Sequence, residues 1–65
     1  MEFVYVVVCG SEWEDMAILL SKEIAINESI NRPNVRVEIF SKNDKSLYLP
    51  TYNYYQNGKL FENSK

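Results

Sequence analysis

The chain has 65 residues, with seven basic and nine acidic side chains, a net charge of −2, one cysteine and no histidine. This length allows one domain, residues 1–65, and a domain of this size buries only ~60% of the surface of its unfolded chain. A single cysteine excludes an internal disulfide, and one thiol without histidine does not complete a zinc site. We therefore expect no metal or other cofactor, and a stability that depends on packing or on a second chain.

Charge and apolar runs limit the partners and the location of the protein. A nucleic-acid binder needs a basic footprint, which this acidic chain lacks overall. The opening apolar run, residues 3–9, is far shorter than the ~20 residues that cross a membrane. Glu2 also stands where a signal peptide carries basic residues. We expect a soluble protein without membrane contact, in the cytoplasm or the interior of a host cell.

The first part of the chain predicts a hairpin. Residues 3–9 are nearly all β-branched or aromatic, and their apolar character on both faces indicates a central strand. Gly10 and Ser11 end this run, and residues 12–15 form a connection. Residues 16–20 are a second short apolar run whose length suits a strand. A hairpin of these two strands is the economical arrangement.

A helix is expected over residues 22–31. Ser21 is a favourable N-cap, and Pro33 ends the helix because its ring disfavours the α conformation of the preceding residue. At roughly 100° per residue, one helical face is expected to pack on the sheet, and Ile24 projects from the opposite side. The packing face consists of Ala25, Ile26, Ser29 and Ile30.

Residues 35–39 alternate apolar and polar side chains with period two, which predicts a strand. Its apolar members, Val35, Val37 and Ile39, are expected to face the core, and Arg36 and Glu38 to face water.

The last part of the chain predicts a second hairpin after a polar loop at residues 41–46. Pro50 confines any strand there to an edge or a strand start, and residues 51–55 favour a strand. Asn57 and Gly58 predict a type I′ turn, because both residues accept a positive φ. Leu60 and Phe61 then form the returning strand.

These elements assemble into an α+β fold of ββαββ type, a mostly antiparallel sheet with one helix on one face. A right-handed crossover from the second strand to the third places the first strand between them. No segment is left over for the other face of the sheet. Side chains of residues 3–9 that point away from the helix then need a cover, so we expect a homo-oligomer, most simply a dimer. Folding of the tyrosine-rich strand over this face within one chain is the alternative.

The chain carries two resemblances to known proteins. Residues 35–42 and 50–58, together with Leu20-Ser21-Lys22-Glu23 and Ala25-Ile26, resemble small uncharacterised proteins of large DNA viruses. This likeness implies a viral protein and carries no assigned function. Met1-Glu2, Val4, Val6-Val7, Gly10 and Lys22-Glu23-Ile24 are similar to the opening of the Dmd family of phage antitoxins. That second likeness covers about the first third of the chain.

Few residues suggest chemistry. A nucleophilic thiol needs a base or a positive neighbour, and without histidine Cys9 is more simply a small apolar residue at a strand end. Glu12, Glu14 and Asp15 could serve a hydrolase or a divalent metal if they converged, whereas a solvated loop accounts for the same run. The sequence has no phosphate-binding loop and no triad motif. We expect that the protein is not an enzyme, and we assign no catalytic residue.

Aromatic side chains are the candidates for binding a partner. Tyr52 and Tyr54 share one face of a strand, and Tyr55 takes the other. A loop tryptophan such as Trp13 either packs over the core or anchors a partner. Tyrosine combines rigid area with a polar group, which suits an interface, although a half-buried edge strand would also account for the cluster. The candidate partner-binding residues are Trp13, Tyr48, Tyr52, Tyr54 and Tyr55.

The sequence therefore predicts a small non-enzymatic protein-interaction module that docks through a tyrosine-rich sheet surface onto an unknown protein. The alternative is a single-stranded nucleic-acid binder that stacks bases on the same tyrosines. Only Arg36, Lys45 and Lys59 could supply nearby positive charge, so nucleic acid is the less favoured partner.

Overall fold

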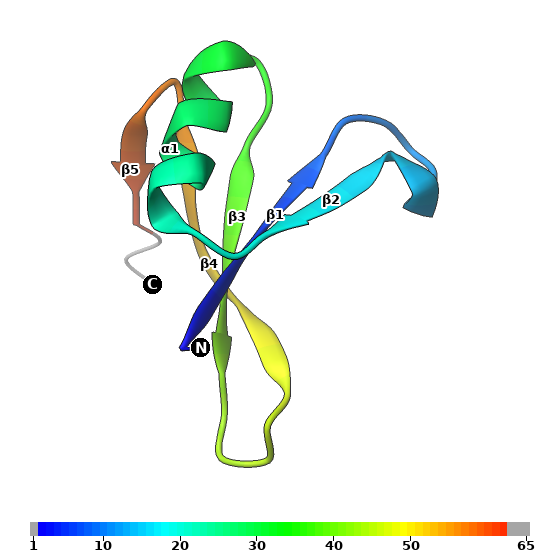
Figure 1. The fold of residues 1–65 in the computed structure, drawn as a ribbon, viewed down its shortest axis with the longest axis vertical. Coiled ribbons are helices and arrows are strands. Elements are labelled where there is room, and N and C mark those ends of the chain that lie inside the picture. The colour runs from blue at the N-terminus through cyan, green and yellow to red at the C-terminus, as the bar shows by residue number, and fades with distance from the viewer. Residues whose placement is uncertain (1, 63–65) are drawn as a thin grey trace.

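In the computed structural model, which describes residues 2–62, five strands form one antiparallel sheet in the order β2-β1-β3-β4-β5 (Figure 1). Residues 2–62 contain one α-helix, α1, which connects β2 to β3 and lies on one face of the sheet. The predicted α+β class and the position of β1 between β2 and β3 are both confirmed. The elements are β1 (Phe3–Val8), β2 (Met16–Leu19), α1 (Lys22–Asn31), β3 (Val37–Lys42), β4 (Tyr48–Gln56) and β5 (Lys59–Phe61).

The helix begins and ends where the sequence predicts. The Ser21 hydroxyl accepts a hydrogen bond from the Ile24 amide at 3.4 Å, which satisfies one of the unpaired donors of the first turn. Ala25 and Ser29 are fully buried against the sheet, and Ile24 is 54% exposed. The predicted helical phase is therefore correct at these positions.

Ile30 departs from the prediction, because about half of its side chain is exposed. Ile30 instead packs beside Gly58 in the β4–β5 turn, where a Cβ atom at Gly58 would approach Ile30 Cγ1 to 2.9 Å. The residue covers the edge of the core, so its burial is incomplete.

The core lies between α1 and the adjacent sheet face. Tyr5 and Tyr55 bring their ring centroids to 6.3 Å across this core. Leu19, Ile26 and Val35 are partly buried around it. The buried cluster consists of Tyr5, Val7, Ala25, Val37, Ile39 and Tyr55.

Val35 contributes to the core without belonging to a strand, since β3 starts only at Val37. Its amide donates to the Arg32 carbonyl at 3.0 Å in the turn that follows the helix. Strand β3 therefore begins two residues later than predicted, because the backbone of Val35 is hydrogen-bonded to the residue that follows α1.

The face of β1 opposite the helix is better covered than the sequence suggests. Val4 and Val6 point to this face, yet they are only 9% and 7% exposed in the single chain. By register they are flanked by Phe40 on β3 and Ile18 on β2. The sheet twists strongly, and β1 crosses β3 at a steep angle in Figure 1. Val4 and Val6 are buried in the single chain, so they give no reason to expect a dimer. The dimer itself stays a prediction.

The β4–β5 turn has the predicted geometry. Asn57 has φ 53° and Gly58 has φ 79°, the two positive values that a type I′ turn requires. The Gly58 amide donates to Ser29 Oγ at 2.9 Å, and Ser29 Oγ in turn donates to the Ile26 carbonyl at 2.7 Å. A buried helix hydroxyl thus fixes the turn against α1.

Ser29→Ala is expected to lower the free energy of unfolding by about 1–2 kcal/mol, because the part-buried Gly58 amide loses its acceptor. Urea denaturation measures this loss, and amide hydrogen exchange should show faster exchange at Gly58. Ser11→Ala, in an exposed loop, is the control and should change the unfolding free energy by less than about 0.5 kcal/mol. Equal unfolding free energies for the two variants would contradict the role of Ser29.

The β1–β2 connection forms a short 3₁₀ turn over Trp13–Asp15. The Asp15 carboxylate accepts a hydrogen bond from the Glu12 amide at 3.2 Å, and the Asp15 carbonyl accepts one from the Cys9 amide at 3.0 Å. The predicted hairpin is confirmed, with Val8 opposite Met16 at its closed end.

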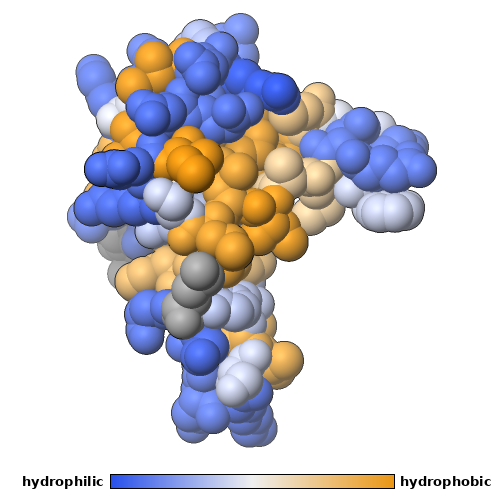
Figure 2. Space-filling view, in the orientation of Figure 1, coloured by the Kyte–Doolittle hydropathy of each residue, from blue (hydrophilic) through white to orange (hydrophobic). Residues whose placement is uncertain are grey.

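Hairpin tips are hydrophilic in Figure 2, and hydrophobic side chains gather between them, below α1.

Candidate partner-binding groove

Aromatic and charged side chains from three segments form a groove on the face opposite α1, over β3, β4 and β5. Tyr54 belongs to this face because its neighbour Tyr55 points into the core beneath the helix. We call this site the aromatic groove; its volume is about 390 Å³. Its lining residues are Arg36, Glu38, Tyr52, Tyr54, Phe61 and Glu62.

The centre of the aromatic groove is a stack of planar groups. Tyr54 on β4 pairs with Phe61 on β5, and their rings stack with centroids 5.2 Å apart and an angle of 9° between planes. The Arg36 guanidinium carbon lies 4.3 Å from the Tyr54 ring centroid, within the range of a cation–π contact. Arg36 also lies 3.8 Å from a carboxylate oxygen of Glu38. The resulting surface presents stacked planar groups and is partly apolar.

A β-bulge in β4 positions the remaining tyrosine of the groove. Glu38 pairs with Tyr54, but Phe40 pairs with Pro50, so residues 51–53 stand opposite the single residue Ile39. The Thr51 hydroxyl donates to the Ile39 carbonyl at 2.8 Å and accepts from the Asn53 amide at 3.1 Å. Thr51 therefore anchors the extra residues to β3. Bulges of this kind commonly redirect a side chain.

Tyr52 occupies a strained backbone position in this bulge. Its φ is 68°, a value that bulky residues rarely adopt, and its side chain is 62% exposed. Such strain costs on the order of 1–3 kcal/mol and is concentrated at functional sites. An aromatic side chain that gains little burial is thus held at the groove at the expense of stability.

The structure separates the five predicted partner-binding residues. Tyr52 and Tyr54 line the aromatic groove together. Tyr48 lies beyond the bulge, opposite Lys42, and is half-buried. Tyr55 is buried in the core with only 6% of its side chain exposed, which corrects its predicted place in the interface.

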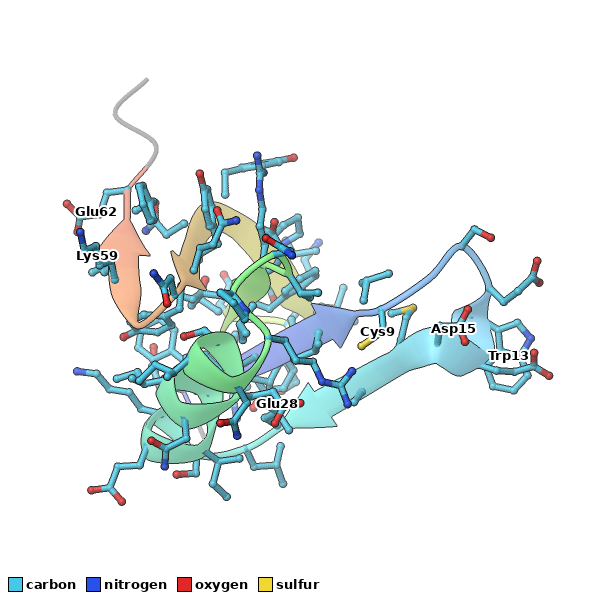
Figure 3. All side chains as sticks on the ribbon, turned by 90° about the horizontal axis from the view of Figure 1, so that it is seen from above. Cys9, Trp13, Asp15, Glu28, Lys59 and Glu62 are labelled. Atoms are coloured by element: carbon cyan, nitrogen blue, oxygen red, sulfur yellow. The ribbon has the colours of Figure 1, made fainter. Side chains whose placement is uncertain are left out.

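Trp13 belongs to a different part of the surface. Figure 3 shows Trp13 at the tip of the β1–β2 hairpin, at the opposite end of the molecule from Glu62 of the groove. Its side chain is 78% exposed, so the alternative that it packs over the core is wrong. Trp13 cannot contact the same small ligand as Tyr52 and Tyr54.

Phe61 lines the groove but was not among the predicted partner-binding residues, although the sequence contains a signal for its position. A two-residue turn at Asn57 and Gly58 fixes the register of the hairpin, which places Tyr54 opposite Phe61. Arg36 is exposed and Glu38 only half-buried, consistent with their prediction as outward-facing, but their position beside Tyr54 depends on the pairing of β3 with β4. The sequence signal for the bulge at Tyr52 is Pro50, which borders it, because proline within a sheet is confined to edges, strand starts and bulges.

The residues that suggested chemistry do not form a site of their own. Cys9 is exposed, and its sulfur accepts a hydrogen bond from the Arg32 guanidinium. The Asp15 carboxylate is engaged with the loop backbone, and Glu12 and Glu14 are exposed. Among residues 2–62, no group of three or more His, Cys, Asp or Glu side chains could hold a metal ion.

No protein-family model, no curated protein and no solved structure matches this chain. The likenesses to viral proteins and to Dmd antitoxins therefore stay predictions. In the part of the chain that the structure describes, no helix combines the length and the apolar character needed to cross a membrane.

Proposed function

We propose that the protein is a small non-enzymatic interaction module that binds a partner protein through the aromatic groove. The observation that carries this proposal is Tyr52, whose aromatic side chain is exposed at a positive φ in an anchored bulge. A purely structural strand would gain stability from a glycine or a regular register at this position. A rigid tyrosine at the edge of a stacked aromatic pair is the type of residue that dominates protein interfaces.

The charges around the aromatic groove favour a partner that presents a basic side chain. Glu38 and Glu62 supply two carboxylates, and the one cation among the lining residues, Arg36, already contacts Tyr54 and Glu38. A lysine or arginine of the partner could lie on the exposed faces of Tyr52 or Phe61 and beside these carboxylates. Phosphate groups of a nucleic acid would meet the same carboxylates, which disfavours the single-stranded nucleic-acid alternative.

Tyr52→Gly is expected to abolish partner binding without a loss of stability. Glycine adopts a positive φ readily, so the free energy of unfolding should stay unchanged or rise by up to about 1 kcal/mol. Thermal denaturation measures this part of the prediction. Tyr52→Phe retains both the ring and the strained backbone, and serves as the matched control that should still bind.

Selection of random peptides displayed on phage tests the binding, with wild-type protein as bait and Tyr52→Gly as the counter-bait. We expect enriched peptides that contain lysine or arginine and that bind Tyr52→Phe but not Tyr52→Gly. Peptides that bind all three proteins equally would contradict a role for the groove. Fluorescence anisotropy with labelled oligothymidine tests the alternative, binding of single-stranded nucleic acid. Salt-dependent binding that is lost in Tyr52→Gly would show that the groove binds single-stranded nucleic acid and not a protein.

A further inference from the structure

The sheet face that carries α1 is only partly covered by the helix. In Figure 1, α1 lies over the upper part of the sheet, and strands continue below its first turn. Where α1 begins, the structure has a pocket of about 260 Å³, which we call the helix-side pocket. Its lining includes Phe3, Tyr5, Lys22, Ile39, Tyr55 and Leu60.

The helix-side pocket is separate from the aromatic groove, because no residue lines both. Tyr55 lines the pocket and Tyr54 lines the groove, and neighbouring side chains of a strand point to opposite faces of the sheet. Binding at one of the two sites can therefore be measured independently of the other.

Two tyrosine hydroxyls of the helix-side pocket lack a protein partner. Tyr5 and Tyr55 are only 8% and 6% exposed, yet neither hydroxyl makes a hydrogen bond to another residue of the described chain. Buried tyrosines usually pair this group. Within residues 2–62, no side-chain oxygen or nitrogen is both inaccessible and without a partner, so both hydroxyls are reached from the pocket that the two residues line. They are available to a bound molecule.

Lys22 supplies a positive charge to the same pocket. It is the one charged side chain among the described lining residues, since neither Glu2 nor Glu23 lines the pocket. No ion pair between described residues includes Lys22. As the first residue of α1, it lies where the positive end of the helix dipole disfavours a cation. Its charge therefore does not stabilise the helix and is free to pair with an anion.

The remaining walls of the pocket are mainly apolar. Phe3 and Leu60 are about half exposed at its rim, and Ile39 is buried. The Thr51 hydroxyl, which also lines the pocket, is already bonded to the backbone of β3 and β4. At about 30 Å³ for each water molecule, a volume of about 260 Å³ holds about nine waters. A ligand of this pocket is therefore small and mostly apolar.

We propose that the helix-side pocket binds a small apolar carboxylate, the chemistry shared by medium-chain fatty acids and arylalkanoic acids. The carboxylate pairs with the Lys22 ammonium and accepts hydrogen bonds from the hydroxyls of Tyr5 and Tyr55. The apolar part of the ligand lies against Phe3 and Leu60, as in other pockets where a few polar groups orient an apolar molecule. A neutral ligand of the same shape leaves Lys22 unpaired.

Nuclear magnetic resonance titration of the isotope-labelled protein with octanoate tests the site. We expect saturable shifts at the amides of the lining residues, with a dissociation constant on the order of 1 mM or lower. Hexanoate should bind about threefold more weakly for each methylene group removed. Hexanol is the neutral control and should bind at least about tenfold more weakly than hexanoate. Hydrocinnamate in place of octanoate distinguishes an arylalkanoic acid from a fatty acid by the tighter binding of one of them.

Lys22→Met retains the apolar stem of the side chain and removes its charge. This variant should weaken octanoate binding by about tenfold, while its melting temperature stays unchanged or rises because a cation leaves the helix N-terminus. Lys45→Met, at an exposed lysine of the β3–β4 loop that does not line the pocket, is the matched control and should bind octanoate like the wild type.

Tyr5→Phe and Tyr55→Phe test the two hydroxyls. Each variant should weaken octanoate binding by about two- to tenfold and leave hexanol binding unchanged. Thermal melting should show no loss of stability, because neither hydroxyl has a partner within the described chain. A loss of stability with unchanged octanoate binding would mean that the hydroxyls serve the fold, and would contradict their role in the pocket.

Absence of saturable shifts at millimolar octanoate overturns the proposal, because water alone then fills the pocket. Equal affinities for hexanoate and hexanol, or unchanged octanoate binding by Lys22→Met, also overturn it. Shifts centred on Tyr54 and Phe61 would place the ligand in the aromatic groove and not in this pocket. Tyr52→Gly should bind octanoate like the wild type, so failure of the helix-side pocket and failure of the aromatic groove are distinguishable.

Discussion

Ala25→Asp is expected to unfold the domain. Ala25 is fully buried between α1 and the sheet, within the cluster that contains Val7, Val37 and Tyr55. A carboxylate there would be larger than the methyl group that it replaces, and it would lie among apolar side chains without a partner. The expected loss is about 4 kcal/mol or more, comparable to the whole stability of a small domain. Circular dichroism should show loss of the helix and of the cooperative melt.

Ile24→Asp is the matched control, because it introduces the same charge at the neighbouring position of the same helix. Ile24 is mostly exposed, and Asp in the first turn interacts favourably with the helix dipole. We expect its free energy of unfolding to stay within about 1 kcal/mol of the wild type. Similar melting temperatures for Ala25→Asp and Ile24→Asp would show that the described packing face of α1 is wrong.

Gly58→Val is expected to lower the free energy of unfolding by about 2–4 kcal/mol, for two independent reasons. Gly58 has φ 79°, which a β-branched residue resists. A Cβ atom at this position would also approach Ile30 Cγ1 to 2.9 Å, so the Ile30 side chain would have to shift. Urea denaturation measures the loss, and amide exchange at residue 58 should become faster.

Asn57→Gly tests the same turn without steric conflict. Asn57 also has a positive φ, and glycine adopts this conformation without a penalty. The unfolding free energy of this variant should stay within about 0.5 kcal/mol of the wild type. A comparable loss in Asn57→Gly and Gly58→Val would mean that general flexibility of the turn, not the φ and the contact with Ile30, determines the effect.

Local patterns in the sequence were sufficient to predict the helix, most of the strand segments and the position of β1 between β2 and β3. The β-branched run of β1, the N-cap at Ser21 and the Asn57-Gly58 turn each depend on residues close in the chain. Hairpin connections and one crossover then leave few arrangements for five short strands. The same local rules placed Tyr54 and Tyr55 on opposite faces of β4, because side chains alternate along a strand.

The aromatic groove could be predicted only in part. The turn at residues 57–58 sets the pairing of Tyr54 with Phe61, which follows from counting residues on either side of the turn. Which tyrosine is buried does not follow from such a count. Tyr55 enters the core because its face of β4 is the one beneath α1, and that depends on where the helix lies.

What the sequence determined by itself is the helix, most of the strand segments, the position of β1 between β2 and β3, and the register of the two-residue turn at residues 57–58, since these follow from side-chain periodicity, backbone preferences and short connections. The tertiary structure decided three further features: the burial of Val4 and Val6 without a second chain, the bulge that holds Tyr52 at φ 68°, and the open edge of β2. Each of these results from contacts between strands. Sheet twist, the mismatch of β4 against β3 and the position of a strand at an edge are properties of the assembled sheet, and no single segment of the chain carries them.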